Sequence, residues 1–122
     1  FKTSDAVDLV ANGLITNEQT LKDNPDLVKK MIRATLRGIE YTVNHPNESF
    51  EISKKYVSTL ASADQKTQKQ VLLNSIEMFK TDHYGFSRPE AWQNMQDILL
   101  KMGLLSQPLD LSQAFTNEYL PQ

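Results

Sequence analysis

The chain has 122 residues, a net charge of −2 and no cysteine. This length accommodates one modest domain, and the absence of a strongly basic balance argues against nucleic acid as the main ligand. The lack of cysteine excludes disulfides, thiolate metal sites and cysteine nucleophiles, and no apolar run in the sequence is long enough to span a bilayer. The sequence begins with Phe1 and not with methionine, so we expect it to be part of a longer or processed protein.

The first regular pattern lies in residues 6–16, where apolar and polar residues alternate. Alternation is typical of a half-buried strand, and the Asn12-Gly13 pair within it is a turn signal. The sequence therefore predicts that residues 1–16 form either a tight hairpin or one extended segment that crosses between two layers. Thr16 or Asn17 can then cap a short helical turn.

The longest helical pattern follows, and its two ends are marked by prolines. Asn24 is a good N-cap, and Pro25 suits the first helical position, where its missing N–H costs nothing. The residue before a proline is disfavoured in a helix, so this helix should end before Pro46. The spacing predicts one helix over 25–44 and a second over 47–61.

Three more helices are predicted in the second half of the chain. Asp64 can cap a helix over 65–80. A fourth helix, over 89–102, carries Trp92 on its apolar stripe, which predicts that this ring is buried in a contact with the first or third helix. Gly103 is a natural C-terminal cap for it. A short helix over 111–119 completes the series.

Few residues in this sequence suggest catalysis or metal binding. His45 and His83 are far apart and fit no metal-ligand spacing, so helix capping is the default role for His45. Lys30, Arg33 and Arg37 could line one edge of the long helix and meet phosphate, but a solvated face is favoured because acidic partners lie at pairing distance. We therefore predict no catalytic residue, no cofactor and no metal.

Two other features could contact a ligand. The loop "DHYGF" at 82–86 places aromatic side chains around a glycine, and such loop residues often meet ligands. Tyr84 is the candidate there. Met95 and Met102, together with Trp92, could form an adaptable groove, although their helical spacing favours core packing.

Several segments together resemble a known family. They are "NGLI" at 12–15, "NP" at 24–25, Gly38 within the long helix, "HP" at 45–46, and the tail "PEAWQNMQDILLKMGLLSQPLDLSQAFTNEYLP". In order and spacing they resemble the C-terminal part of solute-binding proteins of ABC importers, in the branch that handles nitrate, sulfonates, taurine and thiamine-pyrimidine or flavin-like precursors. The resemblance covers nearly the whole chain.

The resemblance implies a fold and a domain organisation. The chain would be mainly α with a short N-terminal β segment, and it would form the C-terminal portion of an α/β two-lobe periplasmic-binding-protein-like fold. Residues 1–16 would be the crossing strand or hairpin, residues 17–103 a helical scaffold, and residues 104–122 a connector and the C-terminal helix.

The resemblance also implies a function. The full-length protein would capture a small molecule outside the cytoplasm, in the periplasm or lipid-anchored outside the membrane, and deliver it to an ABC permease without catalysis. Asn12 and Gly13 would lie near the ligand cleft, with Tyr84 as the next contact candidate. Because much of the family's cleft is missing, the isolated chain should bind small ligands weakly and self-associate, by pairing of strands that contain Val7 and Leu9 or by a helix swap.

Two alternatives remain open from the sequence. The first is a free-standing helical interaction domain. The second, which has less support, is a fragment of an enzyme like the thiamine-pyrimidine synthases of a related branch, which use histidine and a cysteine-rich motif that is absent here.

Overall fold

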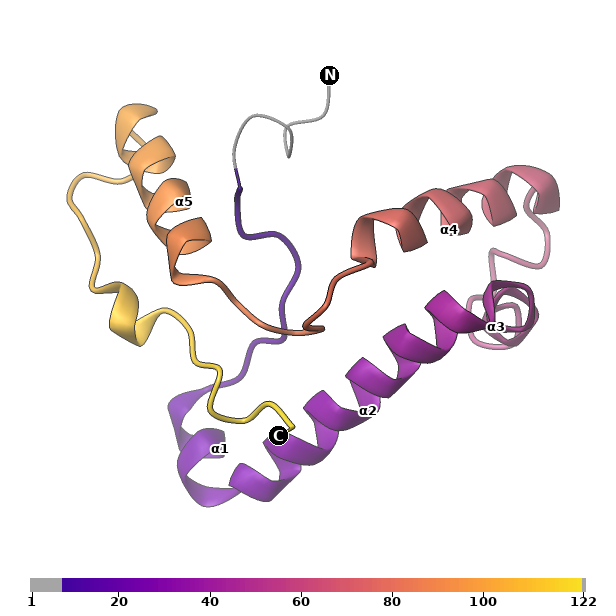
Figure 1. Ribbon diagram of the computed structural model, residues 1–122, viewed down its shortest axis with the longest axis horizontal. Coiled ribbons are helices and arrows are strands. Elements are labelled where there is room, and N and C mark those ends of the chain that lie inside the picture. Colours follow the sequence, from indigo (N-terminus) through magenta and orange to yellow (C-terminus); the bar gives the residue numbers. More distant parts are fainter. Residues whose placement is uncertain (1–7, 122) are drawn as a thin grey trace. The chain divides into compact units, whose positions relative to one another are not determined.

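The computed structural model describes residues 8–121, and Figure 1 shows them as helices joined by loops. In chain order the elements are α1 (Glu18–Asp23), α2 (Pro25–Asn44), α3 (Pro46–Ser53), α4 (Gln65–Phe79), α5 (Pro89–Lys101) and the 3-10 turn η2 (Leu111–Gln113). The short helical turn predicted after Asn17 is α1, and the side chain of Asn17 accepts a hydrogen bond from the Thr20 N–H.

The described residues fall into two compact units. The terminal unit consists of residues 8–29 and 85–121, and the central unit consists of Lys30–Tyr84. The boundary between them falls inside α2, so this one helix contributes its first residues to one unit and the rest to the other.

The α2 helix has the predicted bounds, from Pro25 to Asn44. The carbonyl of Asn24 accepts hydrogen bonds from the N–H groups of Leu27 and Val28, which defines its first turn. Although α2 is strongly amphipathic, none of its residues is buried. Helices in proteins gain most of their stability by packing an apolar face, so the apolar face of α2 is only partly used in this chain.

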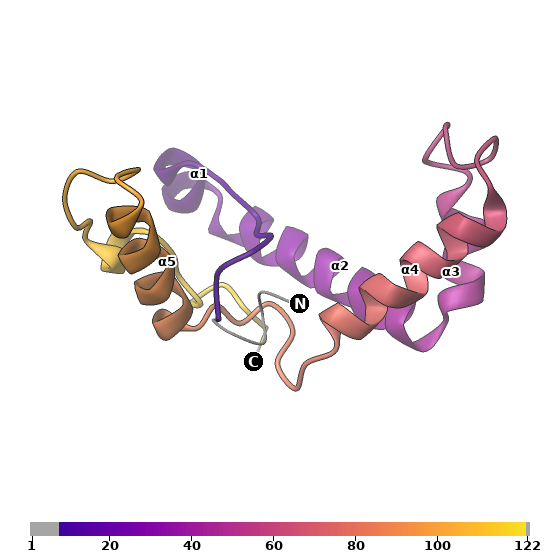
Figure 2. The same cartoon turned by 90° about the horizontal axis from the view of Figure 1, so that it is seen from above.

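The core of the central unit lies where α3 packs against α4 (Figure 2). Phe50 of α3 is 4% exposed and Ile76 of α4 is 5% exposed. The α4 helix begins as predicted at Asp64, whose carboxylate accepts from the Lys66 N–H at 3.1 Å and the Thr67 hydroxyl at 2.6 Å.

The second predicted helix, over 47–61, was too long. The α3 helix ends at Ser53, and the N–H groups of Lys55 and Tyr56 bond three residues back, which is a turn pattern. The chain then continues in turns to the α4 cap. Tyr56, which lies within the predicted helix but beyond the end of α3, is 83% exposed.

In the terminal unit, α5 and the C-terminal segment run side by side (Figures 1 and 2). Gly103 follows the helix with φ +70°, a conformation that favours glycine and that agrees with its predicted capping role. The predicted helix over 111–119 is reduced to the three-residue turn η2.

The predicted N-terminal β segment and the α/β fold were wrong for this chain. Residues 8–121 contain no strand and no sheet. A strand requires a neighbouring strand to pair its backbone N–H and C=O groups, and residues 8–17 have none. Leu9 and Val10 are half-buried, but Leu14 is 57% and Ile15 98% exposed. Val7, which formed part of the predicted alternation, lies outside the described residues.

Candidate functional site

The three ligand contacts predicted from the sequence do not form one described site. Asn12 and Gly13 are exposed in the segment before α1, and a Cβ placed on Gly13 would meet no atom within 4 Å. Tyr84 is half-buried in the loop after α4 and belongs to the central unit. Their roles as ligand contacts stay predictions.

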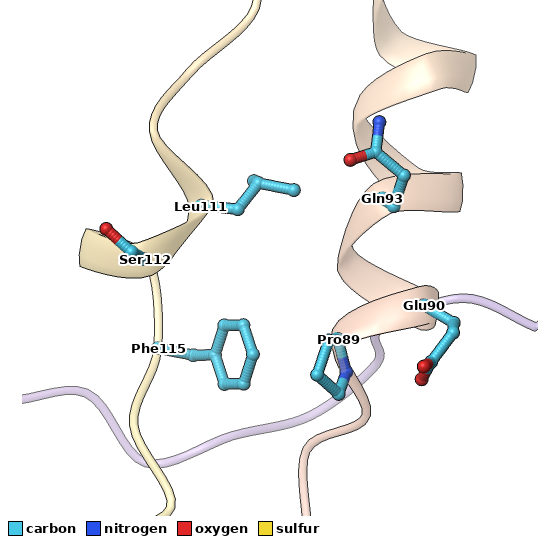
Figure 3. A pocket seen from close by; sticks show the side chains of 6 residues that line it. All are labelled: Pro89, Glu90, Gln93, Leu111, Ser112 and Phe115. Atoms are coloured by element: carbon cyan, nitrogen blue, oxygen red, sulfur yellow. The ribbon is translucent and has the colours of Figure 1, made fainter.

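A pocket of about 410 Å³ lies in the terminal unit, between the first turns of α5 and the tail around η2 (Figure 3). We call it the α5–tail pocket. Figure 3 shows Leu111 and Phe115 on one side, facing Pro89 and Gln93 on the other. Its complete lining is Pro89, Glu90, Gln93, Leu111, Ser112 and Phe115.

An aromatic stack fixes one wall of this pocket. The rings of Trp92 and Phe115 lie 5.1 Å apart at an interplanar angle of 4°. Such pairs contribute about 0.5–1.5 kcal/mol beyond the area they bury. Trp92 itself is half-buried, and its Nε1 is enclosed without a hydrogen-bond partner among the described residues. The sequence predicted a buried Trp92 in contact with the first or third helix; the ring is instead half-buried, and its aromatic partner is Phe115 of the tail.

Three polar contacts hold the tail on α5. Asn117 forms a pair of hydrogen bonds with Ser87: its Nδ2 donates to the Ser87 carbonyl at 2.9 Å, and its Oδ1 accepts from the Ser87 N–H at 3.0 Å. The Leu109 N–H donates to Oε1 of Gln96, a side chain that is only 7% exposed. Sequence reasoning missed both Asn117 and Gln96. A polar residue on the apolar face of a helix, as Gln96 is, was the available signal.

The same helix also holds the N-terminal segment. The Asp8 carboxylate forms an ion pair with the Arg88 guanidinium at 2.7 Å. The backbone carbonyl of Asp8 accepts a hydrogen bond from Nδ2 of Asn94 at 3.0 Å. Segments from both ends of the described chain are therefore attached to α5 by side-chain contacts.

In the terminal unit, the pKa of Asp110 in the tail is shifted. The Ser112 hydroxyl, followed by the Ser112 backbone N–H, lowers the pKa of Asp110 below its ordinary value of 3.8 by hydrogen bonding. These bonds make Asp110 the N-cap of η2. They also direct the Ser112 hydroxyl away from the pocket, as Figure 3 shows.

The central unit has a groove of its own, of about 360 Å³, between α2 and α4. Its lining is apolar or small and carries no charge: Thr35, Gly38, Ile39, Thr42, Val43, Leu72, Ser75, Ile76 and Phe79. A Cβ on Gly38 would meet nothing within 4 Å, so the groove is open at that point. It offers apolar contact but little polar chemistry.

The histidines and the acidic residues form no metal centre in the part of the chain that the structure describes. Among residues 8–121 no three His, Cys, Asp or Glu side chains are grouped so that they could hold an ion. His45 precedes α3 and packs against the Tyr41 ring at 4.6 Å, but its side chain makes no capping hydrogen bond. Glu48 raises the pKa of the Tyr41 hydroxyl, chiefly by a side-chain hydrogen bond. The described helices include none with the length and apolar character that a bilayer crossing needs.

Comparison with known protein families tests the resemblance to solute-binding proteins that the sequence suggested. Residues 1–49 match the model of the NMT1/THI5-like family. The match contains the "NGLI" and "NP" segments, the whole of α1 and α2, and the first half of α3. It confirms the resemblance predicted from the sequence.

Curated relatives extend the similarity to nearly the whole chain. The riboflavin-binding protein RibY of Chloroflexus aurantiacus is 36% identical over 97% of this chain. The 4-amino-5-hydroxymethyl-2-methylpyrimidine phosphate synthases of Legionella pneumophila and Aspergillus parasiticus are each 27% identical, over 88% and 87% of it. The chain spans about a third of the length of these relatives: 35%, 32% and 29% respectively.

Proposed function

We propose that this chain is the C-terminal part of a solute-binding protein, which captures a small molecule outside the cytoplasm and presents it to an ABC permease. The observation that carries the proposal is the 36% identity to a riboflavin-binding protein over 97% of the chain. Riboflavin or another flat heteroaromatic molecule is the first ligand to test. Titration of riboflavin with the full-length parent should quench flavin fluorescence, and no saturable change with riboflavin or related precursors would contradict the proposal.

A synthase is the second candidate function, because two relatives carry that name at 27% identity. The binding role is favoured by the higher identity to RibY. Iron-dependent formation of the pyrimidine phosphate by the full-length parent would support the synthase and contradict the binding role. The parent incubated without iron is the matched control.

An independent helical interaction domain is less compatible with the fold. Such a domain should bury the apolar stripe of each helix, whereas α2 has no buried residue. Large apolar side chains in both units are exposed as well, including Leu104 at 65% and Met78 at 82%.

Asn12, Gly13 and Tyr84 are the ligand contacts that we propose for the full-length protein. In that parent, Asn12→Ala and Tyr84→Ala should weaken ligand affinity more than they lower the melting temperature. Calorimetry that finds unchanged affinity in both variants would remove these residues from the site. Ala11→Ser is a suitable neighbouring control, because Ala11 is exposed in the same segment.

We also propose that the isolated chain self-associates. Exposed apolar side chains favour association because contiguous apolar patches are rare on monomers. In the central unit Met31 is 57% exposed, one helical turn before Thr35 of the α2–α4 groove. Association through this face is compatible with a helical chain and requires no strand pairing.

A further inference from the structure

We propose that Asn12-Gly13 is a site of covalent self-modification, at which the Asn12 side chain cyclises onto the Gly13 backbone nitrogen and then opens to aspartate or iso-aspartate. The substrate of this reaction is the chain itself, and water is the co-reactant. The inference goes beyond the proposed solute-binding function and does not depend on it.

The backbone nitrogen of Gly13 is available for the reaction. It lies in the segment of residues 8–17, which contains no helix and no strand. No acceptor among residues 8–121 bonds to the Gly13 N–H. In a helix or a sheet this N–H would be held in a hydrogen bond, and the nitrogen could not turn toward a neighbouring side chain.

The space around this nitrogen is open. Asn12 and Gly13 are both exposed, and a Cβ placed on Gly13 would meet no atom within 4 Å. Neither residue has a positive φ, so the pair does not form the type I′ turn that an Asn-Gly sequence favours. The glycine also leaves the backbone free to rotate, so the Asn12 side chain can reach the nitrogen that follows it.

The reaction balances with water alone. After losing its proton to solvent, the Gly13 nitrogen attacks Cγ of Asn12, a bond forms between them, and the bond from Cγ to Nδ2 breaks as ammonia leaves with a proton. Water then opens the cyclic imide. Cleavage between Cγ and the Gly13 nitrogen gives aspartate, and cleavage at the backbone carbonyl of Asn12 gives iso-aspartate, in which the chain runs through the former side chain.

Asn17 is an internal control in the same segment. Its Oδ1 accepts a hydrogen bond from the Thr20 N–H at 2.8 Å, which holds the amide at the start of α1. It is followed by Glu18, whose side chain crowds the backbone nitrogen. Asn24 cannot react by this route, because Pro25 has no N–H.

The test is incubation of the whole chain in mildly alkaline buffer, with and without guanidinium chloride, followed by mass spectrometry of its peptides. Asn12 should exchange NH₂ for OH and give iso-aspartate at the same rate in both solutions, because the fold does not restrain its segment. Asn17 should react about five-fold faster in guanidinium chloride, since release of a typical N-cap bond corresponds to that factor.

A variant separates attack by the Gly13 nitrogen from direct hydrolysis of the Asn12 amide. Gly13→Ala should remove most of the iso-aspartate formed in the same incubation, because the added methyl group crowds its own nitrogen. It should leave the helical circular dichroism unchanged, since this methyl group meets no neighbour. Ala11→Ser, on the other side of Asn12, is the matched control and should leave the rate unchanged.

Three results would overturn the proposal. The first is the absence of reaction at Asn12. The second is a rate at Asn12 that rises in guanidinium chloride as much as the rate at Asn17, which would mean that the fold restrains both residues equally. The third is iso-aspartate formation that Gly13→Ala leaves unchanged.

Discussion

Replacement of Phe50 by alanine tests how the central unit is held together. Phe50 is 4% exposed, and the Lys54 ammonium group lies over its ring, 5.0 Å from the centroid, in a cation–π contact. A buried Phe→Ala change costs about 3–5 kcal/mol. The whole central unit, Lys30–Tyr84, should have a stability of only about 3–8 kcal/mol at the usual value per residue. The substitution should therefore remove much or all of that stability.

Hydrogen exchange gives the most direct readout. If the unit opens as a whole, the backbone amides of α3 and α4 should lose about 100- to 4,000-fold of their protection, since each 1.4 kcal/mol is a factor of ten. Amides of α5 should retain theirs, because α5 belongs to the other compact unit. Tyr56→Ala is the matched aromatic control: at 83% exposure it should change stability by no more than about 0.5 kcal/mol.

Two outcomes would refute this reasoning. Unchanged protection in α3 and α4 would mean that Phe50 contributes little to the core. Equal loss of protection in α5 would mean that the two units unfold as one cooperative body.

Three further predictions concern the tail, the caps and association. Asn117→Ala should release the tail at a cost of about 1–3 kcal/mol, because two part-buried hydrogen bonds to Ser87 are lost; a red shift of Trp92 fluorescence would show it, and an unchanged spectrum would contradict it. Asp64 and Asp110 both have pKa values below their ordinary 3.8, so their stabilisation is fully present above pH 3.8 and is lost as the pH falls through the lowered values. Urea unfolding at about pH 6 and about pH 3 should show a smaller acid loss in the Asp64→Asn variant than in the parent, and an equal loss would refute the assignment. Met31→Glu, which preserves helix propensity, should reduce the mass measured by light scattering at micromolar concentration; a parent chain that is already monomeric would disprove self-association.

Local signals predicted the helices most accurately where a cap and a proline act together. The α2 bounds follow from Asn24, Pro25 and Pro46, since a proline fixes its own φ and restricts the residue before it. The starts of α4 and η2 follow from Asp64 and Asp110, whose carboxylates accept backbone N–H groups. The order and spacing of such segments were also sufficient to recognise the family resemblance that the match of residues 1–49 confirms.

The N-terminal segment shows why a local pattern can fail. Alternation in residues 6–16 expresses a preference for extended backbone, but a strand exists only when a second strand pairs with it. No residue in the described chain does so. The predicted end of the second helix was wrong for a related reason. Apolar spacing continues to Tyr56, but this side chain is exposed, so no burial stabilises a helix there.

What the sequence by itself determined, then, is the helical character, the capped ends and the family resemblance, because caps, prolines and apolar spacing act over three or four residues. The tertiary structure alone decided the α5–tail pocket. Phe115 reaches Trp92 and Asn117 reaches Ser87 across more than twenty residues of chain. A contact between such distant residues depends on how the intervening loop folds back, and that depends on the packing of the whole unit.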